Sequence, residues 1–189
     1  GIDNLRKIAN NQIITIIGAG GTGSVIAESL VHMGFNTINL IDNDILEVSN
    51  MNRIVGAYYD DALKNHKKVE VISNHLKKIN PNAIINSYCN DIYDIKVEKV
   101  IAQSDWLIMA TDNHSSRKYA QDLAFQYYIP FISVGVNITV ENGLITDESG
   151  EVINVRIGDR VCLDCLKRIN HVKVAHERNT AGKAVSQKL

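Results

Sequence analysis

The sequence predicts an α/β fold: a doubly wound, mainly parallel Rossmann-like sheet with an antiparallel C-terminal extension. Short apolar runs alternate with helical patterns, a glycine-rich segment directly follows the first run, and the alternation stops after residue 136. Strands that alternate with helices form a parallel sheet covered on both faces. The 189 residues are enough for one such domain.

Five apolar runs predict the parallel strands, and a helical pattern follows each of the first four. The expected strands are Ile13–Ile17, Thr37–Ile41, 83–88, 106–110 and 131–136; the expected helices are 24–33, 62–79, Ile95–Ile101 and 116–127. Gly34 ends the first helix, since glycine commonly follows a helix C-terminus.

The C-terminal third of the chain has a different pattern. The runs 138–145 and 151–157 flank the turn-forming segment 147–150, which predicts an antiparallel hairpin. Residues 168–189 are polar and lack a strong apolar period. We therefore expect a folded domain over 1–167, followed by a mobile segment over 168–189.

Composition excludes several classes of protein. The chain is 45% hydrophobic and 22% charged, unlike a disordered tail. Its 20 basic and 21 acidic residues give a net charge of −1, which argues against a general binder of nucleic acid or membrane surfaces. No apolar run approaches a membrane helix, and three cysteines do not make a disulfide framework, so we expect a reducing, cytoplasmic setting.

The strongest local signal is the segment GAGGTGS at 18–24, which follows a strand and opens a helix. Its glycines are Gly18, Gly20, Gly21 and Gly23. Glycines there let the backbone approach phosphate oxygens, and the free amides at the positive helix end hold the anion. The motif also satisfies the dinucleotide fingerprint, so by itself it does not separate NAD from ATP.

Asp42 closes the second strand, 19 residues after Gly23. A carboxylate at this place usually binds ribose hydroxyls, and we favour that role for Asp42. Asp44 follows two residues later. Since Asp and Asn are also turn formers, a ligand contact and a simple turn stay equally open for Asp44.

Three further charged residues are candidates for the site. Arg53 falls in the loop after the second strand and Lys68 in the next helix, although isolated residues of these types are usually solvated. Asp112 follows the fourth strand, where either a ligand contact or a helix N-cap suits an aspartate.

Cys162 and Cys165 form a CxxC motif, which in a reducing compartment is more often half a zinc site than a disulfide. The only other cysteine, Cys89, is expected in the core. His171 and His176 follow at a spacing that is not a recognised zinc finger. Bound zinc at a partial site and two unmetallated thiols stay equally open.

Five segments, taken in order, resemble the ThiF/MoeB/HesA-like superfamily, the adenylating domain of ubiquitin-activating-type enzymes. They read GAGGTGS at 18–24, LIDND at 40–44, SNMNR at 49–53, KVEVISNHLKKINPN at 68–82 and ATDNHSSR at 110–117. The resemblance covers about residues 12–168. It implies that 1–167 is an ATP-binding adenylation domain, that 168–189 is a crossover segment, and that the domain is truncated, because the family's second CxxC is missing.

The resemblance also implies roles for individual residues. Asp42 binds ribose in this comparison, and Asp112 holds Mg²⁺. Asn50, Arg53 and Lys68 contact the phosphates. The 15-residue spacing from Arg53 to Lys68 leaves Lys67 as an alternative. Forming an acyl-adenylate joins two anions, so charge neutralisation by Arg, Lys and Mg²⁺ suits that chemistry.

The implied function is ATP- and Mg²⁺-dependent adenylation of the C-terminal carboxylate of a ubiquitin-like or sulfur-carrier protein, or of a peptide, by a homodimer. Two other functions stay open. An NAD-dependent oxidoreductase shares the glycine loop and Asp42, but Arg53, Lys68 and Asp112 would then have no role. A non-catalytic scaffold within a heterodimer is the third reading. ATP–pyrophosphate exchange separates the three.

Overall fold

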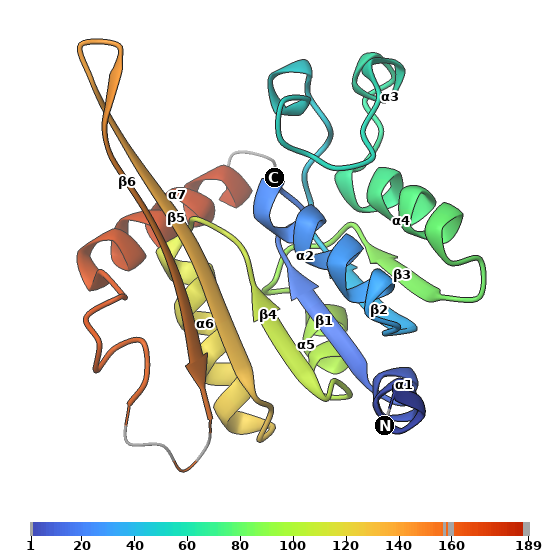
Figure 1. Cartoon of the computed structure of the whole chain (residues 1–189). Helices are drawn as coiled ribbons and strands as arrows, with labels where there is room; N and C mark the ends of the chain where they lie inside the picture. Colours follow the sequence, from blue (N-terminus) through green and yellow to red (C-terminus); the bar gives the residue numbers. More distant parts are fainter. Residues whose placement is uncertain (1, 157, 159–160, 187–189) are drawn as a thin grey trace.

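The computed structural model describes residues 2–156, 158 and 161–186. Within these residues one sheet of six strands has the order β3-β2-β1-β4-β5-β6 (Figure 1). The strands are β1 (Ile13–Ile17), β2 (Thr37–Ile41), β3 (Ile84–Tyr88), β4 (Trp106–Met109), β5 (Phe131–Glu141) and β6 (Leu144–Val155). The pairs among β1 to β5 are parallel, and β6 pairs antiparallel with β5. The predicted doubly wound, mainly parallel fold is confirmed.

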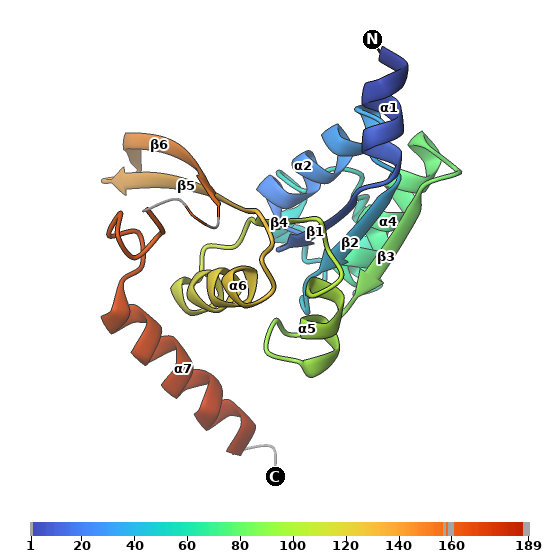
Figure 2. The same ribbon diagram turned by 90° about the horizontal axis from the view of Figure 1, so that it is seen from below.

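Helices cover both faces of this sheet, as strands with buried side chains on both sides require. The helical elements are α1 (Ile2–Asn10), α2 (Gly21–His32), η1 (Val48–Asn50), α3 (Tyr59–Leu63), α4 (Lys68–Ile79), α5 (Ile95–Ile101), α6 (His114–Gln126) and α7 (His171–Ser186). One buried cluster packs α2 and α4 against residues such as Ile16 and Ile38. A second packs α5 and α6 against Ile17 and Leu107 on the opposite face (Figure 2).

The predicted hairpin is present, but its turn lies earlier than expected. β5 and β6 meet at Asn142 and Gly143, whose φ angles are 52° and 78°. Positive φ at both central residues is typical of a type I′ turn, for which Asn-Gly is a favoured sequence. Residues 147–150, expected as the turn, lie within β6 instead, and position 157 falls outside the described residues. The tip of the hairpin projects beyond the body of the molecule (Figure 1).

The helix expected over 62–79 is broken into two. The short helix α3 ends at Leu63, and Asn65 then takes a left-handed φ of 53°. Helix α4 begins only at Lys68. The break matters for the site, because it puts Lys68 at the first position of α4.

The segment 168–189 contains a helix where the sequence suggested a loop. Helix α7 runs from His171 to Ser186, and residues 187–189 lie outside the described residues. Ile169 and Val174 are buried in the cluster beside α6, at 5% and 8% exposure. Mobility of this segment stays a prediction. Among the helices of the described residues, none has the length and hydropathy needed to cross a bilayer.

Candidate functional site

A cavity of about 1460 Å³ opens at the carboxyl ends of the parallel strands. It lies at the point where the strand order reverses, between β1 and β4, which is the usual ligand crevice of open α/β sheets. Every nucleotide-site residue singled out from the sequence except Gly23 lines this cavity: Gly18, Gly20, Gly21, Asp42, Asp44, Asn50, Arg53, Lys68 and Asp112.

The glycine loop joins β1 to α2 with very little space between backbone segments. Gly18 has a φ of +96°, and its amide donates to the Ile41 carbonyl at 2.9 Å. A Cβ on Gly23 would lie 1.8 Å from the Gly18 carbonyl oxygen, so Gly23 allows the helix to approach the loop. A Cβ on Gly20 would meet nothing within 4 Å. Gly20 therefore faces open space, whereas Gly23 serves packing.

Asp42 organises the loop through its carboxylate. Oδ2 accepts from the Ala19 amide at 2.7 Å, and Oδ1 accepts from the Asp44 amide at 2.9 Å. These bonds fix the carboxylate at the end of β2, facing the same cavity as the glycines. A carboxylate accepts more than one hydrogen bond per oxygen, so the two bonds leave capacity for ribose hydroxyls.

Lys68, rather than Lys67, faces the cavity. The Lys68 ammonium lies 2.6 Å from Asp44 Oδ2, and its side chain is only 12% exposed. Lys67 is not among the cavity-lining residues; its Nζ lies 3.4 Å from the Asn43 carbonyl oxygen. The geometry therefore favours Lys68 in the choice between the two lysines.

The loop after β2 supplies Asn50 and Arg53. The Arg53 stem packs over Gly21, where an added Cβ would approach it to 3.2 Å. Nη1 of Arg53 donates to the Ser49 carbonyl oxygen at 2.9 Å. Asn50 is buried at 7% exposure, and its Oδ1 accepts from the Glu47 amide. Asn50 therefore shapes the turn that presents Arg53.

The alternative role of Asp112 as a helix cap is wrong. The N-cap of α6 is Asn113, whose side chain accepts from the Ser116 amide at 2.9 Å. Asp112 is exposed and lines the cavity. Arg117 on α6 is partly buried and donates to the Thr111 carbonyl at 3.0 Å. Burial lowers the pKa of Arg117, and the nearby carboxylates of Asp112 and Glu151 oppose that shift.

Sequence reasoning missed two groups of cavity-lining residues. Asn90 and Asp91 follow β3, and their place after a predicted strand was a usable signal. An apolar wall comes from one face of the hairpin: Ile132, Val134, Val136, Ile138 and Val152. Its alternation along β5 is visible in the sequence, but the cavity it faces depends on the sheet order.

The two thiols of the CxxC motif are close enough to bind one metal ion together. Cys162 Sγ and Cys165 Sγ lie 3.4 Å apart, near the separation of about 3.8 Å expected for two thiolates on tetrahedral zinc. A backbone hydrogen bond involving Cys162 lowers the pKa of Cys165. His171 pairs with Asp164 at 3.0 Å. Within the described residues no group of three or more His, Cys, Asp or Glu side chains forms a metal site, and zinc at Cys162 and Cys165 stays a prediction.

The fold and the cavity are those of the nucleotide-binding class of doubly wound α/β proteins. A family model described as the ThiF family matches residues 1–186, and this chain belongs to that family. The resemblance found in the sequence is confirmed.

Three relatives show the range of similarity. The chain is 28% identical over 151 residues to the sulfur carrier protein ThiS adenylyltransferase of Bacillus subtilis (strain 168), covering 80% of this chain and 42% of that protein. It is 30% identical over 167 residues to the molybdopterin-synthase adenylyltransferase of Escherichia coli (strain K12), covering 88% and 63%. The crystal structure of E. coli MccB with ATP matches with a TM-score of 0.63 at 27% identity, covering 69% and 39%. The chain thus spans less than two thirds of each relative.

Proposed function

We propose that this chain uses ATP and Mg²⁺ to adenylate the C-terminal carboxylate of a small ubiquitin-like or sulfur-carrier protein, or of a peptide. The observation that carries the proposal is a single cavity lined by the glycine loop, by the carboxylates of Asp42, Asp44 and Asp112, and by two cationic side chains. The names of the two adenylyltransferase relatives support the same reaction. They also support a small carrier as the substrate.

In the proposed reaction the substrate carboxylate attacks the α-phosphorus of ATP. An oxygen–phosphorus bond forms, the bond from the α-phosphorus to the bridging oxygen breaks, and pyrophosphate leaves with the electron pair. The attacking carboxylate is already ionised, so no general base is needed. Both reactants are anions, and catalysis therefore consists mainly of positioning and charge neutralisation.

Each side chain has a part that suits its chemistry. The amides of the glycine loop and the start of α2 would receive phosphate oxygens. Arg53 offers a guanidinium fork, and Lys68 offers a compact charge from a mostly buried side chain. Asp42, held by the Ala19 and Asp44 amides, is placed to accept ribose hydroxyls.

Asp112 fits a divalent cation. Its exposed carboxylate lines the cavity, and Asn113 rather than Asp112 caps α6. Mg²⁺ is typically held in such sites by one or two carboxylates together with substrate phosphates, whose charge it neutralises. If zinc binds, Cys162 and Cys165 would supply two of the four ligands of a structural site, and no step of the reaction is assigned to the zinc.

The hairpin favours a homodimer. Val136, Ile138 and Val152 belong to the apolar wall of the cavity and are still 62%, 55% and 71% exposed. Isolated exposed apolar residues are ordinary, but a contiguous strip of them is typical of an interface. We therefore propose that a second copy of this chain covers part of the strip.

ATP–pyrophosphate exchange in the presence of candidate carriers tests the proposed function. Exchange that depends on a carrier with a free C-terminus supports it, and blocking that carboxylate as an amide should abolish the signal. Binding of a nicotinamide dinucleotide without ATP exchange would favour the oxidoreductase. Tight dimers that neither bind ATP nor exchange would favour the scaffold.

A further inference from the structure

The first turn of α6 is held by a carboxylate from α7. Glu177 Oε2 accepts from the Ser115 amide at 2.7 Å, and Oε1 accepts from the His114 amide at 3.4 Å. The first amides of a helix have no partner within that helix. Asn113 accepts from the Ser116 amide. Glu177 and Asn113 together therefore accept hydrogen bonds from the first three amides of α6.

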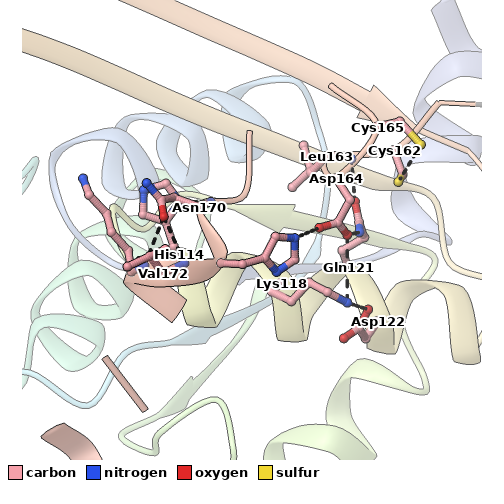
Figure 3. A network of polar contacts seen from close by, with 12 residues as sticks. His114, Lys118, Gln121, Asp122, Cys162, Leu163, Asp164, Cys165, Asn170 and Val172 are labelled. Carbon is pink, nitrogen blue, oxygen red and sulfur yellow. Dashed lines mark hydrogen bonds and ion pairs between the residues drawn. The ribbon is translucent and has the colours of Figure 1, made fainter. Parts of the chain in front are cut away.

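A second contact joins the same two helices at their beginnings. The Asn170 amide donates to His114 Nδ1 at 3.3 Å. The Asn170 side chain in turn accepts from the Val172 and Lys173 amides at the start of α7 (Figure 3). The first residue of α6 is therefore bound through its ring to Asn170, the residue before α7, and through its backbone to Glu177 within α7.

The chain before α7 is docked along α6 as well. Gln121, which is 1% exposed, accepts from the Leu163 amide at 2.7 Å and donates to Asp164 at 3.0 Å (Figure 3). Leu163 is fully buried. These contacts fix the place from which Glu177 reaches the first turn of α6.

Asp112 lies in the segment between β4 and α6, two residues before His114. On its upstream side this segment is tied to the sheet, because the Ala110 amide donates to the Ile17 carbonyl at 2.8 Å. The Thr111 carbonyl accepts from Arg117 Nε at 3.0 Å. On its downstream side the anchor is the first turn of α6, and there Glu177 takes two of the amide bonds.

We propose that Glu177 is a positioning residue for the metal site: by fixing the start of α6, it holds Asp112 where Mg²⁺ on the ATP phosphates requires a carboxylate. The inference rests on the proposed function, because it takes Asp112 as the Mg²⁺ ligand. Without Glu177 the His114 and Ser115 amides lose their acceptor, and the first turn of α6 frays. Groups that orient a metal ligand typically change metal affinity by about 10- to 100-fold when removed.

The test compares Glu177→Ala and Glu177→Gln with Lys173→Gln, in the full chain. Lys173 is exposed on the same helix, so its substitution changes the charge by the same magnitude without touching α6. The probe is Mn²⁺, titrated by electron paramagnetic resonance with the ATP analogue AMPCPP present. AMPCPP affinity without metal and thermal unfolding are measured beside it.

We expect Glu177→Ala to weaken Mn²⁺ binding about tenfold, with AMPCPP affinity in the absence of metal unchanged. Glu177→Gln keeps one acceptor oxygen, so its affinity should fall between those of Glu177→Ala and the parent, and Lys173→Gln should match the parent. If Glu177→Ala does not fold, the Gln variant decides.

Two results would overturn the inference, and they are distinguishable. Parent-like Mn²⁺ affinity in a folded Glu177 variant, or equal losses of metal and metal-free nucleotide binding, removes the positioning role and leaves the proposed function standing. Failure of the parent protein itself to bind Mn²⁺ with AMPCPP removes both.

Discussion

The ammonium nitrogen of Lys68 lies 2.6 Å from Oδ2 of Asp44, although the two residues are 24 positions apart in the chain. Their backbones also meet, since the Lys68 amide donates to the Asp44 carbonyl at 3.2 Å. The start of α4 is thereby tied to the segment after β2, and the Lys68 side chain is directed toward the cavity. Lys67, its neighbour in sequence, is not among the residues that line the cavity.

This relationship predicts unequal effects for the two lysines. Lys68→Ala should lower the rate of ATP–pyrophosphate exchange about 100-fold, because a preorganised charge facing the phosphates is lost. Lys67→Ala, the matched control, should change the rate by less than about fivefold, as expected for a peripheral charge. Exchange rates at saturating ATP check this, and equal losses in the two variants would contradict the assignment of Lys68.

Alanine substitutions at two glycines of the loop should have different effects, one on stability and the other on ATP binding. Gly23→Ala places a Cβ 1.8 Å from the Gly18 carbonyl oxygen, so it should cost about 3 kcal/mol of stability or more. Gly20→Ala meets nothing within 4 Å and should stay within about 1 kcal/mol, while its methyl group enters the cavity and weakens ATP binding. Urea unfolding and ATP titration measure the two effects. Comparable stability in both variants would show that the close approach at Gly23 does not exist.

The proposed dimer depends on one face of β5. Ile138→Glu puts a charge on the apolar face and should shift sedimentation at micromolar concentration from dimer to monomer. Asn137→Glu adds the same charge on the opposite face, because successive strand residues alternate, and should leave the dimer intact. A parent protein that sediments as a monomer contradicts the dimer, and dimers in both variants place its interface elsewhere.

The fold was predictable where the sequence pattern is local. Ile13–Ile17 and Thr37–Ile41 are short, mainly apolar runs, and the structure has both strands with these bounds. The break at Asn65 was not visible, because the apolar period continues on both sides of it while the backbone turns left-handed. The hairpin turn was misplaced because the Asn-Gly signal at 142–143 was passed over for a longer polar segment.

The residues of the candidate site were predictable from the sequence, whereas the contacts that hold those residues in place were not. Asp42 and Asp112 follow strands, and parallel strands bring their carboxyl ends to one edge. Glu177 gave no such signal, since its partners lie 62 and 63 positions away and its helix has no strong apolar period. Contacts of this kind depend on how two helices pack, which local periodicity does not encode.

The roles of adjacent Asp112 and Asn113 can be separated by experiment. Asp112→Asn keeps the size of the side chain but removes the charge proposed to anchor Mg²⁺. It should lower ATP–pyrophosphate exchange by about 100- to 1000-fold, equivalent to about 3–4 kcal/mol. Its thermal stability should be unchanged, because Asn113 caps α6.

Asn113→Ala is the matched variant. It removes the acceptor for the Ser116 amide and should cost about 1 kcal/mol of stability, as loss of an N-cap usually does. Exchange should fall less than in Asp112→Asn, since the carboxylate is still present and Glu177 still holds the His114 and Ser115 amides. Thermal unfolding beside exchange at saturating Mg²⁺ measures both. If Asp112→Asn exchanges at the parent rate under those conditions, Asp112 is not the metal ligand.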